Sequence, residues 1–129
     1  MTPELIYLVW SVALTLVLAV IAVSGATLEV GLPRLAGNRE NMPEMSSWAG
    51  RAARAHRNML ENLVLFAILV FAARFANVSN AMTLLGAQLF FFGRVAHAVI
   101  YIAGIPWLRT AAWTVSVIGL LLILWQLVA

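Results

Sequence analysis

Arginine, asparagine and glutamate side chains recur at helical spacing just before an apolar stretch. Arg54, Arg57, Asn58 and Glu61 stand at positions i, i+3, i+4 and i+7, so a helix would carry them on one face about 100° wide. Residues 63–71, which follow, are apolar enough to lie in a membrane. Ionisable groups at membrane depth cost about 3 kcal/mol each and need partners. The spacing therefore predicts a helix face that meets protein, water or a bound polar ligand.

Two further groups of polar residues follow in later helical segments. Arg94, His97 and Tyr101 are spaced i, i+3 and i+7 and again share one face. Arg109 and Thr110 stand at the start of another expected helix, where free backbone N–H groups and the helix dipole favour anions. These segments hold several arginines against one nearby carboxylate. The surplus of positive charge predicts an anionic ligand that bears carboxylates or a thiolate.

A structural interpretation competes with ligand binding. In it, Glu61 pairs with Arg54, Arg57 or Arg94 and holds the helices together, since polar groups within membranes commonly bridge helices. This hypothesis explains Glu61 and Arg94 as well as ligand binding does. It explains Arg109 less well, because one carboxylate cannot neutralise all of these arginines. Both interpretations stay open from the residues alone.

The composition is that of a membrane protein with several spans. Of the 129 residues, 64% are hydrophobic and 10% are charged, and the mean hydropathy is +0.97. Soluble domains are about half apolar and about a quarter charged. Every basic residue is an arginine and every acidic residue a glutamate. The forked guanidinium group suits bidentate contacts with carboxylates or phosphates in poorly hydrated places.

Several classes of function are disfavoured. The net charge of +3 does not predict a nucleic-acid partner, because the arginines lie in or beside apolar helices and form no free basic tract. The absence of cysteine excludes disulfides, thiolate catalysis by the chain itself and cysteine metal sites. Nothing near His56 or His97 completes a metal-ligand set, so no metal site is expected. A transporter is disfavoured, since the chain lacks internal repeats and broken helices.

The hydropathy pattern predicts one domain, residues 1–129, with four membrane-spanning helices. The expected spans cover about 5–29, 48–75, 81–103 and 106–128, each long enough for a hydrocarbon core of about 30 Å. A polar loop is expected from Gly31 to Ser47, with Ser46 or Ser47 capping the next helix. The other two connections are short. An all-α, up-down antiparallel bundle is therefore expected.

Arginine counts predict the orientation of this bundle. The first and third connections with their flanks hold Arg34, Arg39, Arg51, Arg54, Arg57 and Arg109. The second connection holds only Arg74, and the N-terminus holds no arginine. The positive-inside rule then puts the first and third connections in the cytoplasm and both termini on the non-cytoplasmic side. We expect a bacterial inner membrane as the location, with the three polar groups converging near its cytoplasmic face.

Taken in order, the polar groups resemble the MAPEG family, the membrane-associated proteins in eicosanoid and glutathione metabolism. The similar blocks are Arg54-Ala55-His56-Arg57-Asn58-x-x-Glu61, Gly93-Arg94-Val95-Ala96-His97-x-x-x-Tyr101 and Arg109-Thr110. They are most similar to the microsomal prostaglandin E synthase branch, and a bacterial member is expected. The length and the four spans fit too, so the resemblance covers nearly the whole chain.

The resemblance implies a homotrimer that binds glutathione between adjacent protomers and acts on a hydrophobic membrane substrate as a transferase, peroxidase or isomerase. The residues that it implies hold glutathione are Arg54, Arg57, Asn58, Glu61, Arg94, His97 and Tyr101. It implies that Arg109 stabilises the thiolate and that Thr110 replaces a serine beside the sulfur. A free thiol with a pKa of about 8.5 is mostly protonated at pH 7, and a fixed guanidinium favours the nucleophilic thiolate.

Three features depart from the family pattern. The first helix ends in Thr27-Leu28-Glu29-Val30, where relatives often carry an arginine that meets glutathione. The following loop has no aspartate, and Trp113 stands where the synthase branch has a tyrosine against the ligand. The thiol is therefore expected to be glutathione or another low-molecular-weight thiol. The alternative is a non-catalytic membrane protein or accessory subunit that binds an anionic lipid or uses the polar stripe as an ion network.

Overall fold

The computed structural model describes residues 1–38 and 47–129, and these parts of the chain contain five helices and no strand. Four of the helices are long: α1 (Pro3–Val30), α3 (Ser47–Phe75), α4 (Ala81–Ala103) and α5 (Pro106–Val128). All four are long and apolar enough to cross a membrane. The prediction of an all-α protein with four membrane-spanning helices is confirmed.

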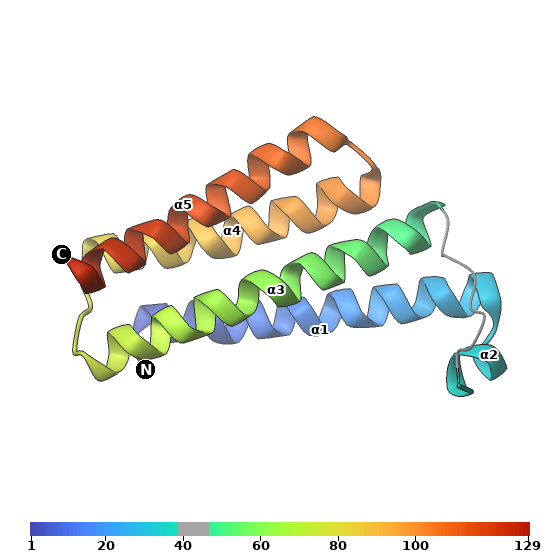
Figure 1. Ribbon diagram of the computed structural model, residues 1–129, viewed down its shortest axis with the longest axis horizontal. Coiled ribbons are helices and arrows are strands. Elements are labelled where there is room, and N and C mark those ends of the chain that lie inside the picture. The colour runs from blue at the N-terminus through green and yellow to red at the C-terminus, as the bar shows by residue number, and fades with distance from the viewer. Residues whose placement is uncertain (39–46) are drawn as a thin grey trace.

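The long helices run alternately up and down (Figure 1). α1 and α3 form one antiparallel pair, and α4 and α5 form a second, more closely packed pair. α4 contacts both α1 and α3, and α3 also contacts α5, whereas α1 and α5 do not approach each other. Both termini and the α3–α4 connection lie at one end of the bundle, and the α4–α5 connection lies at the other. The start of α3 and the start of α5 are therefore neighbours in the fold.

Capping groups explain where several helices begin and end. The backbone N–H of Leu5 donates to Thr2 Oγ1 at 3.4 Å at the start of α1. Asn80 and Thr83 form a capping box at the start of α4. Gly104 ends α4 in the left-handed region, at φ 84°, which a glycine adopts without steric cost. These local signals produce the two short connections.

One expectation about the first connection is wrong. Within the loop expected from Gly31 to Ser47, residues Leu32–Ala36 form a short helix, α2. Pro33 is suited to the first turn of a helix, and the buried side chain of Leu35 gives α2 a packed face. Ser47 already belongs to α3. Ser46 and Arg39 lie outside the described residues.

The α4–α5 pair is packed through glycine. A Cβ added at Gly86 would lie only 2.7 Å from the carbonyl oxygen of Gly119, so the two backbones approach as small residues allow in membrane helices. Between the pairs, the rings of Phe66 and Phe90 stack with centroids 4.1 Å apart. Each of these two side chains is fully buried. This packing fixes α5 against α4, and α4 against α3.

The helices differ in length. α3 has 29 residues, whereas α4 and α5 have 23 each. At 1.5 Å per residue, α3 is about 43 Å long and the other two are about 34 Å long. Because a hydrocarbon core is about 30 Å thick, α3 and the 28-residue α1 extend further beyond it than α4 and α5 do. The polar residues of α3 occupy its first turns.

Candidate functional site

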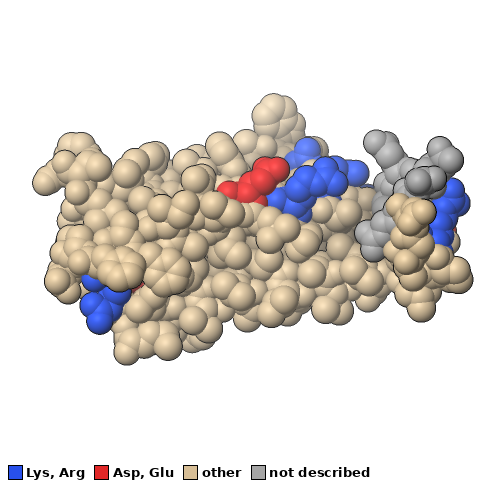
Figure 2. All heavy atoms as spheres, turned by 60° about the horizontal axis from the view of Figure 1, so that its bottom comes forward, with Lys and Arg blue, Asp and Glu red and all other residues tan. Residues whose placement is uncertain are grey.

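The polar face predicted from the sequence lies on the first turns of α3. Arg54, Arg57 and Glu61 are exposed there, and Asn58 is half-buried. A pocket of about 180 Å³ is lined by these four residues and by Tyr101 of α4. Figure 2 shows acidic and basic side chains side by side on an otherwise uncharged part of the surface. The structure therefore gathers the predicted stripe around one opening between two helices.

A second pocket, of about 200 Å³, adjoins the first at the start of α5. Its lining residues are Asn58, His97, Tyr101, Arg109, Thr110 and Trp113. Because Asn58 and Tyr101 line both pockets, the two cavities share a wall. We call the residues that line either pocket the polar site. It joins α3, α4 and α5.

Aromatic rings organise the centre of the polar site. The guanidinium carbon of Arg109 lies 4.4 Å from the centroid of the Tyr101 ring, a cation–π contact that holds the charge in place. The rings of His97 and Tyr101 have centroids 5.3 Å apart. On the next residue, the Thr110 hydroxyl donates only a long bond of 3.4 Å to the carbonyl of Pro106. A fixed cation thus stands beside a weakly engaged hydroxyl.

Arg94 lies behind the polar site and does not line it. Its side chain is 1% exposed, and its Nη2 donates a hydrogen bond of 2.7 Å to Asn58 Oδ1. The same nitrogen is 3.4 Å from His97 Nδ1. Nε and Nη1 have no hydrogen-bond partner among the described residues. Arg94 therefore contacts two residues of the polar site, Asn58 and His97, from the interior of the bundle.

Asn62 supports the site, although the sequence pattern did not predict this role. Its Nδ2 donates to the backbone oxygen of Asn58 at 2.9 Å and approaches Asn58 Oδ1 at 3.4 Å. Asn62 is buried and lies one helical turn after Asn58. The signal that would have found it is this i, i+4 spacing of two amides. Asn58 is consequently fixed by Arg94 on one side and by Asn62 on the other.

Two other polar residues of α3 lie outside the polar site. Arg51, at the edge of the predicted face, donates from Nε to the backbone oxygen of Ile102 at 2.8 Å. Its guanidinium packs on Gly104, where an added Cβ would lie 3.2 Å from Nε. His56 is half-buried and lines neither pocket. Arg51 therefore secures the end of α4, and neither residue reaches the site.

The polar site carries more positive than negative charge. Arg54, Arg57 and Arg109 line it against the single carboxylate of Glu61. Glu61 forms no ion pair with the described part of the chain. The interpretation in which Glu61 pairs with Arg54, Arg57 or Arg94 is therefore not observed within the protomer. A ligand that carries both carboxylates and an ammonium group would match this set of charges.

An apolar groove continues from the polar site between α3 and α5. It has a volume of about 440 Å³ and is lined by Asn62, Leu65, Ile68, Leu69, Trp113, Val117, Leu120, Leu121 and Leu124. Trp113 lines both the groove and the polar site. A polar and an apolar molecule can therefore lie next to each other, with Trp113 between them.

The sequence was also compared with known proteins. The family model described as MAPEG family matches residues 5–129. No curated protein and no solved structure matches the chain. The match covers α1 from Leu5 onward, all of α3, α4 and α5, and every residue of the polar site. Together with the four membrane-spanning helices, it identifies an integral membrane protein, and this chain belongs to the MAPEG family.

Proposed function

We propose that the protein binds glutathione, or another low-molecular-weight thiol, in the polar site and uses it on a hydrophobic substrate from the membrane. The observation that carries the proposal is the position of Arg109. Its guanidinium is held over the Tyr101 ring and shares a pocket with Asn58 of the charged α3 face. Membership of a family of glutathione and eicosanoid metabolism supports the same function.

The charges of the polar site match those of glutathione. This tripeptide carries two carboxylates, one ammonium group and one thiol. In the proposed complex, Arg54 and Arg57 bind the carboxylates through charge-assisted hydrogen bonds, and Glu61 binds the ammonium group. The remaining cation, Arg109, then faces the sulfur.

Arg109 and Thr110 act on the sulfur in this proposal. A fixed guanidinium favours the thiolate over the thiol because the negative charge is stabilised next to it, and the thiolate is the reactive nucleophile. The Thr110 hydroxyl, which makes only a long bond within its own helix, donates to the same sulfur. The reaction class is then transferase, peroxidase or isomerase, according to the electrophile that the groove admits.

We also propose that the protein is a homotrimer in which a neighbouring protomer completes the site. The two polar pockets, of about 200 and 180 Å³, together reach only the low end of the roughly 300–1,000 Å³ of typical small-molecule sites. Arg54, Arg57 and Glu61 are exposed, although charged groups near the hydrocarbon need polar partners. A second protomer packed over this face would enclose the ligand.

The location proposed is a bacterial inner membrane, with the polar site at its cytoplasmic face and both termini on the other side. The arginines of the polar site stand at one end of the bundle, where the positive-inside rule puts the cytoplasm. Within the MAPEG family we propose a place near the microsomal prostaglandin E synthase branch, which the three polar blocks resemble. Its substrate is not part of the proposal, since a fold and a site can serve different substrates.

Calorimetry with glutathione on the detergent-solubilised protein tests the function. The wild type is expected to bind glutathione and to show the ultraviolet absorbance of a bound thiolate at neutral pH. Arg109→Ala should lose the thiolate absorbance, whereas Arg51→Gln, an arginine variant outside the polar site, should keep it. If the wild type binds anionic lipid but no thiol, the protein is the non-catalytic binder of the alternative hypothesis.

A further inference from the structure

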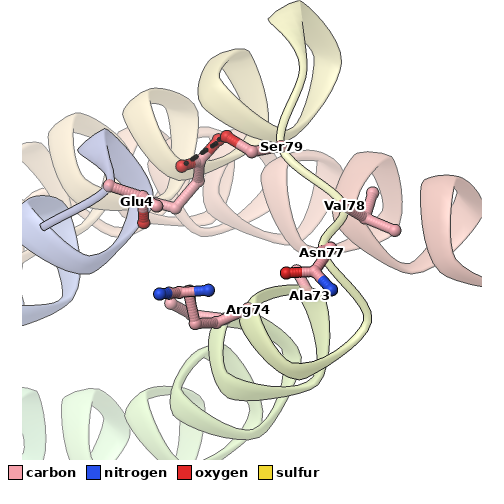
Figure 3. A pocket seen from close by; sticks show the side chains of 8 residues that line it. Glu4, Ala73, Arg74, Asn77, Val78 and Ser79 are labelled. Atoms are coloured by element: carbon pink, nitrogen blue, oxygen red, sulfur yellow. Dashed lines mark hydrogen bonds between the residues drawn. The ribbon is translucent and has the colours of Figure 1, made fainter.

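A separate pocket lies at the opposite end of the bundle, where α1 begins and α3 ends. It has a volume of about 210 Å³, and its polar lining residues are Thr2, Glu4, Arg74, Asn77 and Ser79. Figure 3 shows Glu4 and Ser79 on one side of this pocket and Arg74 on the other. None of these residues belongs to the polar site. We call this cavity the Glu4 pocket.

The carboxylate of Glu4 is buried without a cation. The side chain is 4% exposed. Its Oε1 accepts a hydrogen bond of 2.7 Å from the Thr83 hydroxyl, and its two oxygens accept bonds of 3.1 and 3.2 Å from the Ser79 hydroxyl. It forms no ion pair with the described residues. Apart from these two neutral donors and the N-terminal end of the α1 dipole, no described side chain pairs with the negative charge, and the carboxylate keeps lone pairs for a further donor.

Arg74 provides the opposite charge on the other side of the opening. It is exposed, stands next to the last residue of α3 and makes no ion pair within the described chain. Its guanidinium lies across the opening from Glu4, which lines the pocket from α1 with its carboxylate turned toward Ser79 (Figure 3). The pocket therefore offers an acceptor for an ammonium group and, across the opening, a donor for an anion.

We propose that the Glu4 pocket binds the headgroup of a phospholipid with a primary amine, of the phosphatidylethanolamine type. In this complex the ammonium group donates to Glu4 and the phosphate accepts from Arg74. Glu4 is the second residue of α1 and Arg74 is next to the end of α3, so the pocket lies at the end of two spans. Lipid headgroups occupy this level of the bilayer.

The chemistry of the pocket selects among headgroups. A trimethylammonium group has no N–H to donate and is recognised by aromatic cages, whereas no aromatic residue lines the Glu4 pocket. A glycerol headgroup brings no cation to the buried carboxylate. The volume of about 210 Å³ is below that of a typical drug-sized site and suits a small headgroup. The primary amine is therefore preferred over both alternatives.

Native mass spectrometry of the full chain in detergent tests the proposal. The protein is mixed in turn with phosphatidylethanolamine, phosphatidylcholine and phosphatidylglycerol that carry identical acyl chains. We expect the ethanolamine lipid to remain bound at least about ten-fold more than either of the others, a difference of about 1.4 kcal/mol. Equal retention of the three lipids would overturn the proposal and leave Glu4 as a contact between helix ends only.

Variants assign the preference to this pocket. Arg74→Gln, at an exposed position, should lower retention of the ethanolamine lipid about ten-fold, and Glu4→Gln should remove the preference over phosphatidylglycerol. Arg57→Gln is the matched control at the polar site and should leave the preference for the ethanolamine lipid over phosphatidylcholine unchanged. Equal loss in Arg74→Gln and Arg57→Gln would contradict the assignment. If free phosphoethanolamine binds as tightly as the lipid, the proposal that the ligand is a membrane lipid is overturned.

Discussion

Asn58 is the residue on which the geometry of the polar site depends. It lines both pockets, and its side-chain oxygen receives the hydrogen bond from the buried Arg94. Its backbone oxygen receives a second bond, from Asn62. A side chain held in this way loses little further freedom when a ligand binds, which lowers the cost of binding. Arg94 acts through Asn58, as a positioning residue.

The first prediction concerns this pair. Asn58→Ala and Arg94→Met are each expected to weaken glutathione binding, since a hydrogen bond to a charged group contributes about 1.5–3 kcal/mol. The double variant should be only slightly weaker than the worse single variant, because both act through one bond. Isothermal calorimetry on the four proteins measures the coupling. Strictly additive losses would show that Arg94 acts independently of Asn58.

Residue spacing predicted which helix faces carry the site but not how deep each side chain lies. The i, i+3, i+7 pattern placed Arg94, His97 and Tyr101 on one face, and the structure has Tyr101 in both pockets and Arg94 behind them. Likewise Arg51, at the edge of its face, donates a hydrogen bond to the backbone oxygen of Ile102 and does not reach the site. How deeply a side chain is buried depends on the neighbouring helix. A periodic pattern on one helix carries no information about that neighbour.

At the scale of the elements, the contact between α4 and α5 positions the proposed sulfur-binding residues. Tyr101 belongs to α4 and Arg109 to α5, and the cation–π distance of 4.4 Å between them depends on how the two helices pack. That packing relies on Gly86 and Gly119, whose backbones touch. The glycines therefore influence a site that they do not line.

The second prediction tests this influence. Gly86→Ala places a Cβ 2.7 Å from the carbonyl oxygen of Gly119, so α4 and α5 must separate. We expect a loss of about 1–3 kcal/mol, as for other overpacked positions, together with weaker glutathione binding. Thermal unfolding in detergent, followed by circular dichroism, measures the first effect, and calorimetry measures the second.

The exposed Ile118 of α5 provides the control for this prediction. Ile118→Ala shortens a side chain on α5, the helix that carries Gly119, without changing the contact between the glycines. It should therefore leave thiol binding unchanged. An unaltered melting temperature and an unaltered affinity in Gly86→Ala would contradict the role given to the α4–α5 packing.

The limits of the helices were largely predictable because their signals are local. Apolar length marked the four spans, and Gly104 with Pro106 marked the break between the last two. α2 was not predicted, because its five residues lie between Gly31 and Gly37 and resemble part of a loop until the burial of Leu35 is known. The burial of Leu35 depends on contacts with other parts of the fold, so the local sequence does not predict it.

On the scale of the whole molecule, charge is divided between the two ends of the bundle. The polar site gathers arginines beside the start of α5, whereas the Glu4 pocket holds a buried carboxylate where α1 begins. The long helices between them present apolar side chains such as Leu16, Val20 and Ile68 outward. An apolar belt with two different polar ends is what a bilayer-spanning protein requires.

The third prediction concerns assembly. If a neighbouring protomer completes the polar site, native mass spectrometry should find glutathione on trimers and not on monomers released by a harsher detergent. The reason is that Arg54, Arg57 and Glu61 stand exposed in the single protomer and hold a ligand only when covered. Circular dichroism confirms that the released monomers remain helical. Monomers that retain glutathione would contradict the shared site.

The junction of the polar site with the apolar groove has a consequence for the delivery of reactants. The polar turns of α3 lie beside the last turns of α4 and the first turns of α5, while the groove next to them is lined mostly by leucines. Under the proposed function, a water-soluble reactant reaches Trp113 through the polar site, and an oil-soluble one reaches it through the apolar groove. Neither has to leave its own solvent until they meet. The protein then works as an interfacial catalyst, and the concentration of each reactant is set by the phase in which it dissolves.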